Sequence, residues 1–230
     1  MGITIWLEHV KEWSNCQRCP LAQQRSQVCL ARSEWPDGAQ APNLRLPCDV
    51  LFVGEAPGMS EDALGFPFVG PAGKLLDDIV ANALPQGVYV AMTNLVVCYP
   101  RLAKERGDNE PERGEVLECR PRLVEFVNLA QPRLIVRVGR MAVQYLNFDY
   151  KVPYADIDHP AHIIRMPLAQ RQMAAQRCIV HLRNAWDDVL ECNGATKEPW
   201  KEWGEKNAEA KTSKREQIKR EYEEVQNWKD

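Results

Sequence analysis

Short apolar runs alternate along the chain with longer stretches of helical periodicity, which is typical of an α/β protein. Apolar residues occupy Val50–Val53, Val88–Met92 and, apart from Arg137, Leu134–Val138, and residues 152–158 are a candidate for one further strand. The run at Val50–Val53 stops at a Gly- and Pro-containing turn, which favours a buried strand that ends there. We therefore expect strands at these positions.

Helices are predicted where apolar residues recur every three or four positions. Pro71 suits the first turn of a helix, because its missing N–H would have no helical partner there. Residues 21–48 and 99–113 are polar or broken by Pro and Gly and predict loops. The helices that we expect lie at residues 3–14, from Pro71 onward with Leu75, Leu76, Ile79 and Val80 inward, 114–130, 139–146 and 168–190.

The last part of the chain differs from the rest in composition. Residues 195–230 contain nine basic and nine acidic residues and few aliphatic ones. This composition is typical of a solvated helix, a coiled-coil fragment or a disordered tail. We therefore expect one domain over residues 1–194, followed by a charged tail at 195–230.

Overall composition restricts the class of protein only loosely. The formal net charge of −3 does not suggest a nucleic-acid binder, although a local basic surface can serve that purpose. The chain shows neither a signal peptide nor an apolar stretch of membrane-spanning length, so we expect a cytosolic protein. In that reducing compartment the eight cysteines are expected to be metal ligands or buried thiols.

Two cysteines form a C-x-x-C turn, Cys16 and Cys19, and two more stand apart at Cys98 and Cys119. Four thiolates from separate regions can close one tetrahedral site, and sulfur ligands favour zinc or iron–sulfur clusters. Buried free thiols remain the alternative at this point. The other cysteines that compete as ligands are Cys29, Cys48, Cys178 and Cys192.

Polar side chains follow several of the predicted strands. Glu55, Asn94 and His159 each come after one, and Phe68 lies in the loop after the first. In open α/β sheets ligands bind at the carboxyl ends of the strands, so these residues are expected to converge. A carboxylate can position water, an amide can read a planar edge, an imidazole can stabilise a developing anion, and an aromatic ring can stack on a base. The set therefore predicts a hydrolytic site.

Several longer motifs follow one another along about residues 12–190. The set resembles family 4 of the uracil-DNA glycosylase superfamily, in the family's own order, and is highly specific for the superfamily. The matching stretches are Cys16-x-x-Cys19-x-Leu21 with Arg25, Gly54-Glu55-Ala56-Pro57-Gly58, Glu61-Asp62, Gly65-Phe66-Pro67-Phe68-Val69-Gly70, Ala72-Gly73, Leu75-Leu76-Asp77, Thr93-Asn94-x-Val96-x-Cys98, Cys119-Arg120-Pro121, Val138-Gly139-x-x-Ala142 and His159-Pro160-Ala161 through Arg165.

This resemblance implies a three-layer α/β/α fold with a four-stranded parallel sheet. It also implies a structural [4Fe–4S] cluster on Cys16, Cys19, Cys98 and Cys119. The implied reaction is hydrolysis of the N-glycosidic bond of deoxyuridine in single- or double-stranded DNA, which releases uracil, leaves an abasic site and begins base excision repair. Such an enzyme must first turn the base out of the DNA stack. We expect a monomer.

The resemblance also implies a role for individual residues. Glu55 matches a carboxylate that positions water or stabilises a cation, and Ala56 beside it belongs to the substrate pocket. His159 matches an imidazole that stabilises charge on the leaving base. The expected base contacts are Glu61 near the uracil C5 edge, Phe68 as the stacking ring and Asn94 as the amide that reads the base. The expected DNA contacts are Ile163 and Ile164 as apolar wedges in a loop that enters the minor groove, and Arg140 and Arg165 at phosphates.

Three rival functions remain on the same fold. A uracil-crosslinking relative would carry a basic loop with a histidine between residues 70 and 90, and this chain has none there. A non-catalytic interaction protein would not need Glu55, Asn94 and His159. A glycosylase for another damaged or modified base fits the same residues. The interval from Cys98 to Cys119 is long for the family, which indicates an insertion in the loop at 99–113.

Overall fold

The computed structural model describes residues 2–33, 44–101, 109–147 and 152–192 of the chain. A four-stranded parallel sheet, in the order β2-β1-β3-β4, forms its centre. The predicted tail and the boundary expected between residues 194 and 195 lie outside the described residues. The chain divides into two compact units, residues 1–189 and 190–230.

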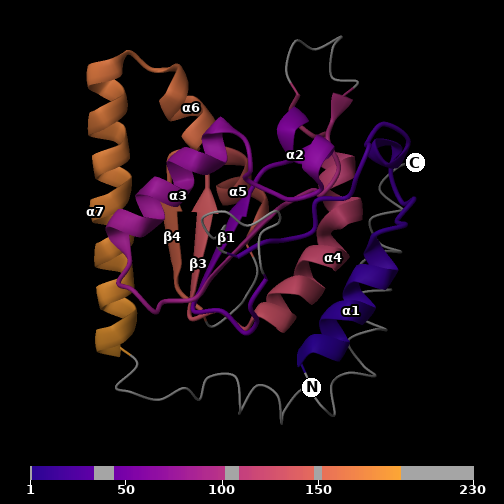
Figure 1. Ribbon diagram of the computed structural model, residues 1–230, viewed down its shortest axis with the longest axis horizontal. Coiled ribbons are helices and arrows are strands. Elements are labelled where there is room, and N and C mark those ends of the chain that lie inside the picture. Colours follow the sequence, from indigo (N-terminus) through magenta and orange to yellow (C-terminus); the bar gives the residue numbers. More distant parts are fainter. Residues whose placement is uncertain (1, 34–43, 102–108, 148–151, 193–230) are drawn as a thin grey trace. The chain divides into compact units, whose positions relative to one another are not determined.

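Helices and strands alternate along the described chain (Figure 1). The elements are α1 (Gly2–Trp13), the 3-10 helix η1 (Pro20–Gln23), β1 (Val50–Gly54), α2 (Met59–Leu64), α3 (Pro71–Ala83), β2 (Val90–Asn94), α4 (Arg113–Ala130), β3 (Leu134–Val138), α5 (Arg140–Tyr145), β4 (Tyr154–Ile157), α6 (Pro160–Arg165) and α7 (Leu168–Cys192).

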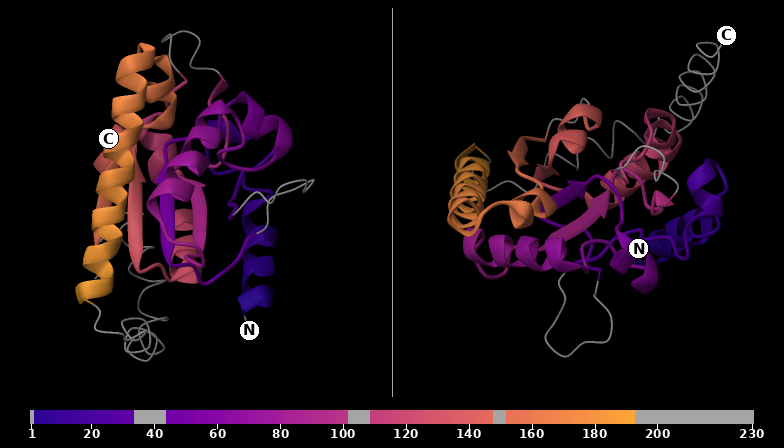
Figure 2. Two further views of the ribbon diagram at one scale, coloured as in Figure 1. Left: turned by 60° about the vertical axis from the view of Figure 1, so that its left-hand side comes forward. Right: turned by 90° about the horizontal axis from the view of Figure 1, so that it is seen from above.

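Helices cover both faces of the sheet, as the predicted α/β/α architecture requires. One face packs against α3, α6 and α7 in a continuous apolar core that includes Phe52, Leu76 and Leu182. On the other side of the sheet α1 packs against α4, and α5 contacts β1 and β3. In both views of Figure 2, α7 and α1 lie on opposite sides of the sheet. Residues of β1 alternate between the two faces and all are buried, which explains why the strand is apolar throughout.

Most predicted elements agree with the structure, and the main differences are at β2, α2 and α6. β2 spans Val90–Asn94, two residues later than expected, so Asn94 closes the strand. Residues 59–64, expected to belong to a loop, form α2, whose Glu61 side chain accepts a hydrogen bond from the Gly58 N–H at the helix start. Residues 160–165, also expected to form a loop, form the short helix α6 with Pro160 in its first turn. Among the described helices, none combines the length and the apolarity that a membrane span requires.

The start of α3 packs so closely on the loop before it that only glycine fits at position 73. A Cβ added there would lie 1.8 Å from the carbonyl oxygen of Phe68. The loop would have to move to admit any side chain, and Phe68 with it.

We expect Gly73→Ala to destabilise the protein by about 1–3 kcal/mol, because overpacking displaces backbone. Gly114→Ala is the matched control, since nothing lies within 4 Å of its added Cβ and the residue is helical. The control should be neutral or slightly stabilising. Thermal unfolding followed by circular dichroism measures both, and equal midpoints in the two variants would contradict the prediction.

Candidate active site

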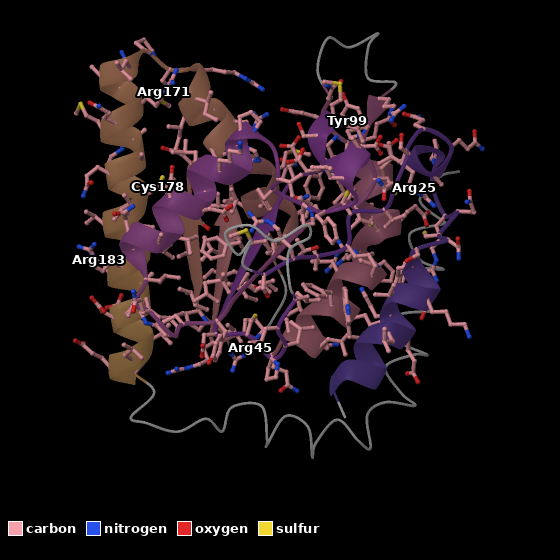
Figure 3. The ribbon with its side chains drawn as sticks, viewed as in Figure 1. Arg25, Arg45, Tyr99, Arg171, Cys178 and Arg183 are labelled. Carbon is pink, nitrogen blue, oxygen red and sulfur yellow. The ribbon has the colours of Figure 1, made fainter. Side chains whose placement is uncertain are left out.

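The described residues form a cleft of about 1270 Å³ at the carboxyl ends of the strands. In Figure 3, Tyr99, which lines the cleft, lies at the upper end of the molecule, and Arg45 lies at the opposite end. Residues that follow all four strands contribute to its walls. The predicted site residues that line it are Glu55, Ala56, Glu61, Phe68, Asn94, Arg140, His159 and Arg165.

Glu55 and Ala56 follow β1 directly, and both are half-buried. Backbone pairing continues beyond the ends of β1 and β2 at this point. The Leu95 N–H donates to the Gly54 carbonyl at 2.9 Å, and the Val96 N–H donates to the Glu55 carbonyl at 3.1 Å. The backbone that carries the Glu55 carboxylate is therefore held by the neighbouring strand connection.

Glu61 is buried and its carboxylate organises the cleft wall. One oxygen accepts the N–H groups of Val69 and Gly70 at 2.9 and 2.7 Å, and the other accepts the Gly58 N–H at 3.1 Å. Each of these bonds joins α2 to a loop that lines or supports the cleft. Glu61 thus lines the cleft and holds together the two loops around it.

Phe68 and Asn94 meet above Gly54, at the floor of the cleft. A Cβ added at Gly54 would lie 2.4 Å from the Asn94 Oδ1 and 2.5 Å from the Phe68 Cζ. Both side chains therefore occupy space that any residue other than glycine would fill. An amide and an aromatic ring in this arrangement can grip a planar base at its edge and on its face.

His159 lies at the start of α6 and serves as its N-cap. Its Nδ1 accepts the Ala161 N–H at 3.2 Å, which places the ring proton on Nε2. Burial, with smaller contributions from Arg165 and His162, lowers the pKa of His159 to about 4, against an opposing effect of Glu61. At neutral pH the site therefore presents a neutral imidazole with one N–H to donate.

The close approach of His159 to the sheet also depends on a glycine. Gly139, which follows β3, has a φ of +86°, and an added Cβ would lie 2.8 Å from the Cβ of His159. Left-handed backbone and lack of space both exclude a side chain there. Gly139 therefore allows the ends of β3 and β4 to meet at the cleft.

The predicted DNA contacts divide into two groups. Arg140 and Arg165 are exposed at the cleft, and Arg140 lies 3.9 Å from Glu110. Ile164 is half-buried. Ile163 is fully buried in the core beneath the sheet, so its prediction as an apolar wedge is wrong. The reason is that α6 is a helix, which turns successive side chains to different sides, whereas a loop was expected.

The predicted cysteine ligands lie in one neighbourhood. Burial raises the pKa of the Cys98 thiol to about 12, Arg25 opposes that rise, and Cys119 and Cys19 add to it. Burial also raises the pKa of Cys19, to which the charges of Cys119 and Cys16 contribute. Arg25 donates to the Cys98 Sγ at 3.5 Å and to the Cys16 carbonyl at 2.8 Å. All eight cysteines are free, and within the described ranges no group of His, Cys, Asp or Glu is arranged to hold a single metal ion.

Comparison with known proteins assigns this architecture to a family. The model of the uracil DNA glycosylase superfamily matches residues 42–183. The chain belongs to the uracil DNA glycosylase superfamily. The resemblance to its family 4 is confirmed by curated relatives that carry the name type-4 uracil-DNA glycosylase.

Three of these superfamily relatives illustrate the extent of the match. The protein of Sulfurisphaera tokodaii is 34% identical over 61% of this chain and 57% of its own length. That of Saccharolobus solfataricus is 39% identical over 43% of this chain and 44% of its own length. That of Thermotoga maritima is 30% identical over 60% of this chain and 62% of its own length. The chain thus spans less than two thirds of the curated relatives that it matches.

Two buried arginines of this superfamily member were missed by sequence reasoning. Arg32 and Arg122 are 1% and 0% exposed, and both donate to backbone carbonyls beneath the cleft. Arg32 lies in a stretch expected to be a loop, and Arg122 lies on the buried side of α4. Periodicity gave a weak signal only for Arg122, which occupies an inward helical position beside Leu123.

The stability of the protein at acidic pH should report the low pKa of His159. Its pKa is about 4 in the folded protein against 6.5 ordinarily, so between these values the unfolded chain binds a proton that the folded protein does not. Stability therefore falls as the pH falls through this window, by about 2 kcal/mol from about pH 7 to about pH 5.

His159→Asn retains a side chain that caps α6 and should remove most of this dependence. The measurement is the urea midpoint as a function of pH, with the exposed His181→Asn of α7 as the matched control. If His159→Asn lost as much stability on acidification as the unchanged protein, a neutral buried His159 would be excluded.

Proposed function

We propose that this protein hydrolyses the N-glycosidic bond of deoxyuridine in DNA, releases uracil and leaves an abasic site, as the first step of base excision repair. The observation that carries the proposal is the meeting of the Asn94 amide and the Phe68 ring at Gly54, in a cleft that Glu55 and His159 also line. The names of the relatives support the same reaction. The proposed substrate is uracil in single- or double-stranded DNA, and the proposed active form is a monomer.

Recognition of the base follows from the floor of the cleft. A base turned out of the stack can lie on Phe68 while the Asn94 amide hydrogen-bonds its polar edge. Asn94 is 2% exposed and Phe68 is 6% exposed, so both contacts form away from bulk water. Hydrogen bonds in such surroundings discriminate strongly, because a base with the wrong edge leaves a buried polar group unpaired.

The residues in the walls of the cleft, His159 and Glu55, are proposed to carry out the bond cleavage. In the proposed reaction the bond between C1′ and N1 breaks, and its electron pair leaves with the base. The neutral His159 donates its Nε2 proton as a hydrogen bond to a carbonyl oxygen of the base, where negative charge develops. The Glu55 carboxylate favours the positive charge on the sugar and orients the water whose oxygen adds to C1′; the water's proton passes to Glu55 or to solvent, and the base anion takes up a proton from solvent on release.

DNA is proposed to reach the cleft along its exposed cations. Arg140 and Arg165 lie on the rim and are available to phosphates. Ile164, half-buried on α6, replaces Ile163 as the residue proposed to fill the space of the extruded base.

We also propose a [4Fe–4S] cluster on Cys16, Cys19, Cys98 and Cys119. The mutual electrostatic influence of these thiols supports it, and a cluster is larger than one ion, so its ligands stand further apart than those of a single metal. When bound, the cluster would supply cross-links between the segment after α1, the exit of β2 and α4. Arg25 would hold this arrangement from the side through the Cys98 sulfur.

An excision assay tests the activity. A labelled oligonucleotide with one uracil is incubated with the protein and then treated with alkali, which breaks the strand at abasic sites. We expect cleavage, and we expect Glu55→Gln and Asn94→Ala to lower the single-turnover rate by about 100-fold or more. Exposed residues remote from the cleft provide matched controls, Glu8→Gln on α1 and Asn82→Ala on α3.

Absence of cleavage by folded protein that contains its cofactor would refute uracil excision. The same assay with other deaminated or modified bases, and a test for a covalent complex with abasic DNA, would then separate the rival functions.

The cluster has a test of its own. Cys119→Ala should lose iron, sulfide and the broad visible absorbance of the purified protein, because one ligand is removed. Cys178→Ala is the control, since Cys178 packs in the core against α3 and the sheet. Equal iron content in the two variants would contradict the proposed ligand set.

A further inference from the structure

Two guanidinium groups lie fully buried beneath the cleft, which is unusual because burying a charge costs free energy unless it is well hydrogen-bonded. The side chain of Arg32 is 0% exposed, and Arg122 is 0% exposed as a residue. Most of their hydrogen bonds end on backbone carbonyls, among them those of Phe68 and Asn94, whose side chains meet at the floor of the cleft. This placement points to a role in positioning that floor.

Arg122 reaches from α4 to the end of β2. It donates to the Thr93 Oγ1 at 2.8 Å, to the Asn94 carbonyl and to the Leu95 carbonyl at 3.1 Å. All three acceptors are uncharged. Among the described residues, the Arg122 Nε has no hydrogen-bond partner. A guanidinium that donates to the carbonyls of two consecutive residues fixes the position and direction of both peptide groups, and so of the Asn94 side chain.

Arg32 does the same for Phe68. Its Nε donates to the Pro67 carbonyl and its Nη2 donates to the Phe68 carbonyl, both at 2.8 Å, and Nη2 also meets the Asp77 carboxylate at 2.7 Å. Phe68 has a φ of +55°. A bulky residue in this left-handed region is strained and persists only where its surroundings hold it. Arg32 supplies that hold, together with the close contact at Gly73.

Both arginines also converge on β2. Arg32 pairs through its backbone with Met92, at 3.0 and 2.7 Å, and Arg122 contacts the next residues of the same strand. Asn94 and Phe68 then meet at Gly54. The two guanidinium groups therefore support, from separate elements, the two segments whose side chains meet at Gly54.

We propose that Arg32 and Arg122 are positioning residues for base recognition, and that they act through Phe68 and Asn94 respectively. This inference rests on the proposed function. Because misplacing a recognition group by about 1 Å can cost about 100-fold in rate, losing either guanidinium should lower excision without changing the affinity for DNA phosphates.

A double-mutant cycle tests the path of action. Arg122→Met should lower the single-turnover rate for uracil excision by about tenfold or more in the unchanged protein, with DNA affinity retained. In an Asn94→Ala background the same substitution should cost less than about threefold, because the group that it positions is gone. An equal fold-loss of the excision rate in the two backgrounds would indicate a merely structural role and overturn the inference.

The corresponding cycle combines Arg32→Met with Phe68→Leu and is read in the same way. Arg133→Met is the matched control for both, because Arg133 stacks over Trp186 and lies near Asp49 at the other end of β3. It should leave the rate unchanged. If a Met variant fails to fold, Arg122→Lys and Arg32→Lys take its place. Each retains the positive charge but can make fewer hydrogen bonds. Each should therefore lose less of the excision rate, and that loss should again shrink when the residue that it positions is also replaced.

A readout that does not depend on activity separates this inference from the proposed function. In ¹⁵N NMR spectra the side-chain amide signal of Asn94, assigned by its loss in Asn94→Ala, should shift in Arg122→Met and stay in place in Arg133→Met. An unmoved signal in folded Arg122→Met would refute the positioning role even if uracil excision is confirmed. A shifted signal in a protein that excises no uracil would keep the positioning role and refute the substrate.

Discussion

Lack of room at the end of β1 is the constraint on which the rest of the cleft depends. Gly54 ends the strand where the Asn94 oxygen and the Phe68 ring would each overlap a Cβ. Because the strands are parallel, their carboxyl ends bring residues from four separate parts of the chain to this point. Gly73 at the Phe68 loop and Gly139 at His159 are constrained in the same way. At each position the neighbouring atoms lie closer than a residue with a Cβ would permit.

Two titratable groups of the cleft wall, an imidazole and a carboxylate, are each constrained by their surroundings. His159 is kept neutral by burial and by nearby Arg165 and His162. Glu61 uses both carboxylate oxygens on backbone N–H groups and thereby holds α2 against the loop that follows it. The two buried guanidinium groups complement Glu61: the carboxylate accepts backbone N–H groups, whereas the guanidinium groups donate to backbone carbonyl oxygens behind the floor of the cleft. A protein with a net acidic chain can thus present a locally organised site, because the local charges and not the total decide what binds.

The cysteine region and the cleft share structural elements. Cys98 lies four positions after Asn94, and Cys119 lies three positions before Arg122 on α4. A buried Asp62 carboxylate also accepts the Ser26 N–H at 2.7 Å and pairs with Arg101, which joins α2 to the segment after Cys19. Cross-links at the cysteines would therefore hold the same segments that carry the Asn94 amide and Arg122, which donates to its backbone.

The sequence by itself determined the sheet, the order of its elements and the residues that converge at its edge. Val50–Val53 is apolar on both faces, Leu134–Val138 is apolar except at Arg137, and strands covered on both sides require such a pattern. Motifs after the strand ends were sufficient to predict Glu55, Asn94 and His159 as neighbours and to indicate the superfamily. Local patterns carry this information because strand burial and turn chemistry depend on adjacent residues.

Only the tertiary structure decided which side chains of those motifs face the cleft and what holds them there. Ile163 and Ile164 are adjacent in sequence and chemically identical, yet the helical turn of α6 buries the first in the core. Arg32 and Arg122 donate hydrogen bonds to residues that lie 36 and 28 positions away along the chain, and no local sequence pattern indicates such partners. The physical reason is that a long polar side chain takes whatever acceptors the packed fold brings within reach, and that geometry exists only after the sheet and its helices have assembled.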